Sequence, residues 1–152
     1  MEIVIFKVNG QPYGMNIDYL EGIEELEHVT PVANAPKFIS GISNVRGEIV
    51  PVFDLAEKFS LEASDLPKKY LLVRLDKTAV CLAVNEVDGM KTFDDSDVFG
   101  VPGIFTEETD YFTKVINIGN NKLALVIAPD MLIPCGEQDD ISEFVSKEAL
   151  NK

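Results

Sequence analysis

The sequence predicts a mainly β protein in which two small barrels share a hydrophobic seam. Short apolar runs rich in β-branched residues are separated by turn signals about every 8 to 12 residues, a spacing typical of β-sandwiches and barrels. The 152 residues are expected to form a single domain, with a first barrel at 1–66, a second at 67–134 and a C-terminal segment at 135–152 that packs back on the barrels. A half of about 70 residues rarely stabilises itself, so the halves should bury a common seam.

The first half opens with a predicted hairpin. Alternating apolar residues predict strands at 3–8 and 13–17, and the Asn-Gly pair at 9–10 is a strong hairpin signal. Two interpretations then stay open: a short helical turn capped by Asp18, or a strand over 22–26. The glycine at the start of that strand weakens the helical alternative.

A crossing loop and a long strand follow. Prolines keep residues 30–37 extended, and 38–42 are predicted to form one helical turn. Residues 47–54 are predicted as a largely buried strand, with Pro51 at an edge or a bulge because proline lacks a ladder donor. One turn of helix is expected at 55–59.

An exposed connection at 60–69 leads into the second half. Strands are predicted at 70–75 and 78–87, and the Asp-Gly pair at 88–89 predicts a hairpin to a short strand at 90–93. The second half therefore begins, like the first, with strand, tight turn and strand.

The long segment 94–110 has acidic ends and an apolar middle that must either dock on the core or contact a partner. Its first carboxylates lack the spacing of a twelve-residue calcium loop, which predicts a solvated loop instead of a cation site. These carboxylates are Asp94, Asp95 and Asp97, and the apolar residues are Val98, Phe99, Val101, Ile104 and Phe105.

The chain ends with a hairpin, a helical turn and a helix. Strands are predicted at 111–118 and 122–127, one helical turn at 129–133, and an amphipathic helix at 139–150 with Asp139 and Asp140 as capping candidates. The helix should dock on the barrels, because a helix this short is marginal alone.

The order of elements in the first half is repeated from residue 70 onward. Most visibly, residues 46–53 are echoed by residues 120–127, and a short segment with helical potential follows each. Residue identity between the halves is low, so the prediction concerns a repeated architecture.

Charge and residue inventory exclude several functions. A net charge of -13, from 26 acidic and 13 basic residues, repels nucleic acid and anionic lipid, and no apolar run approaches the roughly 20 residues of a membrane span. We therefore expect a soluble cytosolic protein. His28 is the only histidine, Cys81 and Cys135 lack a metal-binding spacing, and no phosphate-loop motif exists, so catalysis, cofactors and metals are not expected.

Residues 38–55 are the most informative stretch, because a glycine-containing turn with one arginine leads directly into the apolar strand. Arg46 has two interpretations that the residues alone leave open. It either makes an internal ion pair with Glu48 or Asp54, or offers its guanidinium to a carboxylate or amide of a partner. The combination suits recognition better than chemistry.

Residues 38–55 resemble the signature of CheW-like chemotaxis coupling domains, which typically read Gly-hydrophobic-x-Asn-Leu-Arg-Gly-x-hydrophobic-hydrophobic-Pro-hydrophobic-x-Asp-Leu. Residues 13–17 and 32–39 are also similar to that family, and the resemblance covers essentially the whole chain. Val45 stands where leucine is usual, a tolerable apolar change. Position by position, the motif that the family associates with receptor coupling falls on Gly41, Asn44, Arg46 and Gly47.

The resemblance implies two intertwined five-stranded SH3-like barrels and a non-catalytic scaffold. Such a scaffold joins the cytoplasmic tip of a chemoreceptor to the regulatory domain of the CheA histidine kinase. Receptor helices would lie in the groove between the barrels, while an apolar patch elsewhere docks the kinase. Two alternatives stay open: a scaffold for a chemosensory output other than swimming, and, from a different class, a small enzyme or small-ligand-binding protein.

Overall fold

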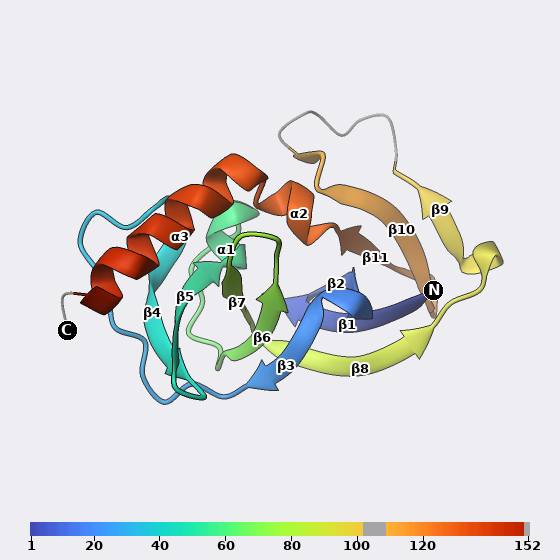
Figure 1. The fold of residues 1–152 in the computed structure, drawn as a ribbon. Coiled ribbons are helices and arrows are strands. Elements are labelled where there is room, and N and C mark those ends of the chain that lie inside the picture. The colour runs from blue at the N-terminus through green and yellow to red at the C-terminus, as the bar shows by residue number, and fades with distance from the viewer. Residues whose placement is uncertain (102–108, 151–152) are drawn as a thin grey trace.

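The fold is mainly β, as predicted, with two sheets and a few short helices (Figure 1). The computed structural model describes residues 1–101 and 109–150. Within them, one sheet has the strand order β8-β1-β2-β11-β10-β9 and the other β3-β6-β7-β5-β4. The segment after residue 94 contributes β9 to the first sheet, which therefore has one strand more than the five expected.

The strands of the first sheet are β1 (Glu2–Val8), β2 (Gln11–Asn16), β8 (Glu86–Thr92), β9 (Val98–Gly100), β10 (Phe112–Gly119) and β11 (Lys122–Ile127). Those of the second are β3 (Leu20–Glu24), β4 (Ile39–Val45), β5 (Glu48–Asp54), β6 (Lys69–Arg74) and β7 (Ala79–Val84). The helices are η1 (Ile17–Tyr19), α1 (Leu55–Lys58), η2 (Asp95–Asp97), α2 (Pro129–Leu132) and α3 (Cys135–Leu150).

Each sheet takes strands from both halves of the chain. The β1–β2 hairpin joins the second-half strands through a parallel pairing of β2 with β11, and β7 joins the first-half strands through a parallel pairing with β5. A division of the chain between residues 66 and 67 therefore does not separate the two sheets. The halves are intertwined, because each contributes a two-stranded antiparallel unit to the other's sheet.

Within the described residues, buried apolar side chains form three clusters. The largest is a seam between the two sheets that α2 and α3 help to cover, and it contains Phe6, Leu71, Leu82 and Ile141 among others. Each sheet also has a cluster of its own on its other face. Strand β7 shows the period of two, since alternate residues face the seam and the sheet's own cluster. Two individual cores with a shared seam agree with the predicted architecture.

The architectural repeat holds at the level of strand register. Phe53 pairs with Leu82 across β5 and β7, just as Ile127 pairs with Met15 across β11 and β2. The β4–β5 and β10–β11 hairpins both close on turns with positive φ at two successive residues. A short helix follows the returning strand of each hairpin. The echo of residues 46–53 in 120–127 thus corresponds to equivalent places in two similar sheets.

Tertiary pairing overrides three local predictions. Residues 38–42 are not a helical turn, because β4 begins at Ile39 and pairs with β5. The 88–89 pair does not form a hairpin turn, because β8 continues through it and pairs with β1. Gly89, with φ +110, lies beside a register shift in that pairing. Helix α3 begins at Cys135, so Asp139 and Asp140 lie inside it and are not caps.

Two other expectations are refined. After β2, the chain forms both alternatives in sequence, a 3₁₀ turn at η1 and then β3. Strand β5 lies inside its sheet, not at an edge, but its pairing with β7 starts at Val52, so Pro51 stands outside that ladder. In the 94–110 segment, Val98 packs on the first sheet's cluster and Phe99 is half exposed, while Ile104 and Phe105 lie outside the described residues.

Candidate partner-binding surface

The β4–β5 turn projects Arg46 from the surface. Arg46 and Gly47 have φ values of +54 and +88, the pattern of a tight hairpin turn that follows the twist of its strands. The side-chain oxygen of Asn44 accepts a hydrogen bond of 2.9 Å from the backbone N–H of Gly47. Asn44 and Gly47 therefore shape the turn, and Arg46 is the side chain that the turn displays.

Arg46 pairs with an acid that the sequence did not single out. Its Nη2 lies 2.6 Å from Oε1 of Glu24, although the angle falls short of a hydrogen bond. The Arg46 side chain is 66% exposed, whereas that of Glu24 is only 18% exposed. Neither predicted internal partner is used: Glu48 is an acid partner of Arg74, and Asp54 accepts from the backbone at the start of α1.

The Arg46 side chain lies over Gly22 of β3. A Cβ placed on Gly22 would stand 2.9 Å from Nη2 of Arg46 and 3.0 Å from Oε1 of Glu24. Strands β3 and β4 are the two outer strands of the second sheet, so this contact brings its opposite edges together. The second sheet curls, and Arg46 spans the place where its edges meet.

An apolar groove lies beside this contact, between β3 and β8. These are outer strands of different sheets, both on the lower side of the molecule in Figure 1, and residues from both line the groove. The groove has a volume of about 260 Å³, and Ile23 and Met90 in it are 42% and 49% exposed. Its lining residues are Ile17, Leu20, Glu21, Gly22, Ile23 and Met90. Because Gly22 is shared, Arg46 stands at the wall of the β3–β8 groove.

Gly41 is separated from the other predicted site residues by burial. A Cβ there would collide with the carbonyl oxygen of Thr30 and stand 2.9 Å from its carbonyl carbon. Thr30 and Ile42 exchange two backbone hydrogen bonds of 2.8 and 2.9 Å, which hold the 25–37 segment against β4. Gly41 therefore permits a close backbone approach and offers no side chain to a partner.

Further charges surround the groove. The guanidinium of Arg74 donates to both carboxylate oxygens of Glu21, at 2.9 and 3.2 Å, and this hydrogen bonding lowers the pKa of Glu21. Arg74 also lies 3.7 Å from Glu48.

One sequence pattern marks the two strands of this groove: residues 20–24 and 87–91 share the order apolar, acidic, glycine, apolar, charged.

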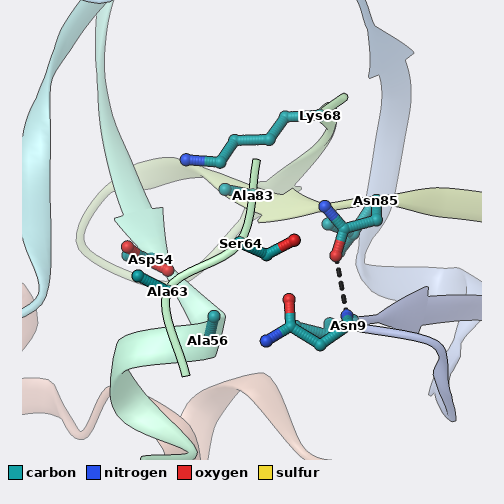
Figure 2. Close-up of a pocket in the computed structure, with 10 residues that line it drawn as sticks. Asn9, Asp54, Ala56, Ala63, Ser64, Lys68, Ala83 and Asn85 are labelled. Carbon is teal, nitrogen blue, oxygen red and sulfur yellow. Dashed lines mark hydrogen bonds between the residues drawn. The ribbon is translucent and has the colours of Figure 1, made fainter. Parts of the chain in front are cut away.

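A polar cavity of about 100 Å³ lies away from this surface, beside the β1–β2 turn (Figure 2). Its labelled lining residues are Asn9, Asp54, Ala56, Ala63, Ser64, Lys68, Ala83 and Asn85. Asn85 accepts from the backbone N–H of Asn9 at 2.7 Å and donates to the carbonyl of Pro67, while Asn9 donates to the carbonyl of Glu62. These amides anchor the 60–69 connection to the sheets.

Metal ligands are not gathered into a cluster in the part of the chain that the structure describes. No cluster of three or more histidine, cysteine or carboxylate side chains there could hold a metal. Burial, with a smaller contribution from the Glu24 carboxylate, raises the pKa of the Cys81 thiol to about 12. Such a thiol stays protonated at neutral pH, and Cys81 is a buried member of the second sheet's apolar cluster.

The two intertwined sheets form a mainly β module with an exposed apolar groove beside Arg46. The model of the CheW-like domain family matches residues 2–135, and the chain belongs to that family. None of the helices in residues 1–101 and 109–150 combines the length and apolar character that a membrane span requires.

Relatives agree with this assignment. The chain is 30% identical over 128 residues to the chemotaxis protein CheW of Klebsiella aerogenes, which covers 82% of this chain and 77% of that protein. It is 24% identical to the chemotaxis protein CheW of Bacillus subtilis, and the match covers 83% of this chain and 82% of that protein. The crystal structure of the scaffolding protein TtCheW from Thermoanaerobacter tengcongensis matches with a TM-score of 0.78 and 23% identity, over 90% of this chain and 94% of that one. That match supports the fold.

Proposed function

We propose that this protein is a non-catalytic cytoplasmic adaptor that joins the tip of a chemoreceptor to the regulatory domain of the CheA histidine kinase. The observation that carries the proposal is the β3–β8 groove with Arg46 at its wall. Membership of the CheW-like family and the names of the chemotaxis relatives supply the class of partner.

A receptor helix binds in the β3–β8 groove through its apolar stripe. Ile23 and Met90 are each about half exposed, and covering them buries apolar surface worth on the order of 1 kcal/mol or more per side chain. Arg46 then meets a carboxylate or amide at the edge of the helix, because much of its guanidinium remains accessible beside Glu24. In this scheme Asn44 and Gly47 position the arginine, and Gly41 holds the neighbouring loop.

The kinase domain requires a second surface, so that both partners bind at once. A hollow of about 420 Å³ lies between the β1–β2 and β10–β11 turns, and Leu123 at its wall is 57% exposed. It is formed by the first sheet, whereas Arg46 belongs to the second. The CheA regulatory domain is itself similar to this fold, so one barrel docking on another is a reasonable geometry there.

Charge reversal of Arg46 tests the receptor site. Arg46→Glu places a carboxylate beside Glu24, and we expect it to weaken binding of a receptor cytoplasmic fragment at least tenfold in calorimetry. Thermal unfolding of the free variant is measured alongside, because the change also removes the ion pair of Glu24, and this measurement separates a loss of stability from a loss of contact. Lys147→Glu, on the exposed face of α3, is the matched control and should bind like the unmodified protein.

Two results would count against the proposal. Normal receptor binding by Arg46→Glu removes Arg46 from the contact surface. Failure of the unmodified protein to bind either the receptor fragment or the kinase regulatory domain removes the adaptor function altogether.

A further inference from the structure

The β3–β8 groove lies between two strands that are equivalents in the repeated architecture. Met90 pairs with Val4 of β1 as Ile23 pairs with Leu71 of β6, and Gly89 and Gly22 occupy matching places beside a register shift. Residue by residue, Leu20, Glu21, Gly22, Ile23 and Glu24 correspond to Val87, Asp88, Gly89, Met90 and Lys91. The two strands run in roughly opposite directions (Figure 1), so the groove has an approximate twofold axis.

The correspondence extends to exposure and ion pairs. Leu20 and Val87 are both half-buried against the seam, and the outer apolar residues of the groove, Ile23 and Met90, have similar exposure. The acid at each register shift pairs with a base on the neighbouring strand: Glu21 with Arg74 at 2.9 Å and Asp88 with Lys7 at 3.6 Å. Apolar contacts alone would therefore accept a helix in either direction along the groove.

One feature breaks this symmetry. Gly22 is covered by the Arg46 guanidinium, whereas a Cβ on the equivalent Gly89 would meet no atom within 4 Å. The turn residue equivalent to Arg46 is Asn120, which shares its φ of +54 but has a shorter, uncharged side chain. The position equivalent to Glu24 is Lys91. One end of the groove thus presents a guanidinium and a carboxylate, and the other an ammonium group.

We propose that the Arg46–Glu24 pair fixes the direction in which a partner helix lies in the β3–β8 groove. This inference rests on the proposed function, since the helix is that of the receptor tip. A helix with one acidic or amide side chain beside its apolar stripe places that side chain at Arg46. There a planar guanidinium can form two parallel hydrogen bonds, which a lysine cannot offer. A helix that binds in the reversed direction keeps the apolar contacts but loses the hydrogen bonds to Arg46.

Spin labelling measures the direction. A receptor cytoplasmic fragment carries a nitroxide near one end of its binding helix, and the adaptor is labelled with ¹⁵N. In the unmodified protein we expect the label to broaden amide signals at one end of the groove only, near Glu24 or near Thr92. Moving the label to the other end of the helix should move the broadening to the other end of the groove.

Three variants then change the symmetry. Arg46→Asn with Glu24→Lys gives both ends the groups of the second end and should broaden both ends, with weaker binding. Lys91→Glu with Asn120→Arg copies the pair to the second end and should also broaden both ends, without that loss of affinity; the turn tolerates arginine, because Arg46 has the same φ. Lys91→Glu alone is the control and should keep one direction.

The outcomes separate the inference from the function on which it rests. If the unmodified protein fails to bind the fragment, the proposed function is wrong. If it binds, but in both directions, or if the two variants with matched ends bind in one direction only, the inference is overturned while the adaptor function stands. Amide spectra of each free variant establish that it is folded.

Discussion

Substitution of Gly41 by alanine distinguishes a packing role from a contact role at this motif position. The added methyl would point at the carbonyl group of Thr30 and stand 3.0 Å from a methyl of Val29. The obstacle is backbone, which cannot move aside without separating Thr30 from Ile42. The change therefore forces the 25–37 segment away from β4.

The size of the effect follows from two contributions. Overpacking of a tight site costs about 1 to 3 kcal/mol. Loss of the two backbone hydrogen bonds between Thr30 and Ile42 adds about 0.5 to 1.5 kcal/mol each. We expect Gly41→Ala to lower the free energy of unfolding by about 2 to 6 kcal/mol, out of the about 5 to 15 kcal/mol typical of a domain.

Urea unfolding followed by circular dichroism measures this change, with Gly136→Ala as the matched control. A Cβ on Gly136 in α3 meets no atom within 4 Å, and alanine favours a helix, so this control should be within about 1 kcal/mol of the unmodified protein and on the stabilising side. If Gly41→Ala unfolds at the control's urea concentration, the steric argument is refuted. If it also loses receptor binding while fully stable, Gly41 is a contact residue.

Three further predictions concern core and surface groups. Gln138 is 1% exposed, and both its amide atoms bond to backbone, so Gln138→Ala should lower the free energy of unfolding by about 1 to 3 kcal/mol; a loss under about 0.5 kcal/mol would contradict this. In the native protein an alkylating reagent should modify exposed Cys135 and spare Cys81, whose pKa is about 12, until urea unfolds the chain; equal native rates would refute its burial. The pKa of Glu21 is lowered in the folded state, so the contribution of its pair with Arg74 is present at neutral pH and lost as pH falls through that pKa. Carbon-detected NMR titration should show the Glu21 pKa rising towards its ordinary value in Arg74→Met, and an unchanged pKa would assign the shift to another group.

Sequence reasoning succeeded where local pattern and tertiary structure agree. The Asn-Gly hairpin, the strand before Leu55 and the amphipathic C-terminal segment carry their signals within about ten residues. It failed where distant strands compete with local signals. The pair at 88–89 has strong hairpin chemistry, yet β1 offers a ladder along all of β8, and glycine with φ +110 fits a bulge as well as a turn.

The same limit applies to the site. Residues 38–55 pointed to Arg46, because a glycine turn beside an apolar strand is a local feature. Its partner, Glu24, is 22 positions away and meets it only because the second sheet curls. The groove was harder still to anticipate in detail: Ile23 and Met90 come from different sheets, and the pairing that exposes them depends on how the halves exchange strands.

In the predicted motif, three residues shape the backbone and one, Arg46, exposes its side chain at the surface. Gly41 lets the 25–37 segment lie against β4, Asn44 closes the turn through Gly47, and Gly47 supplies the positive φ. All three act on backbone, so under the proposed function we expect their substitution to alter recognition by moving Arg46 or its surroundings. In a chain of net charge -13, long-range forces disfavour an acidic partner. Under the proposed function, attraction prevails only at short range, where the Arg46 guanidinium can form hydrogen bonds, and we expect this to restrict binding to partners whose shape first fits the groove.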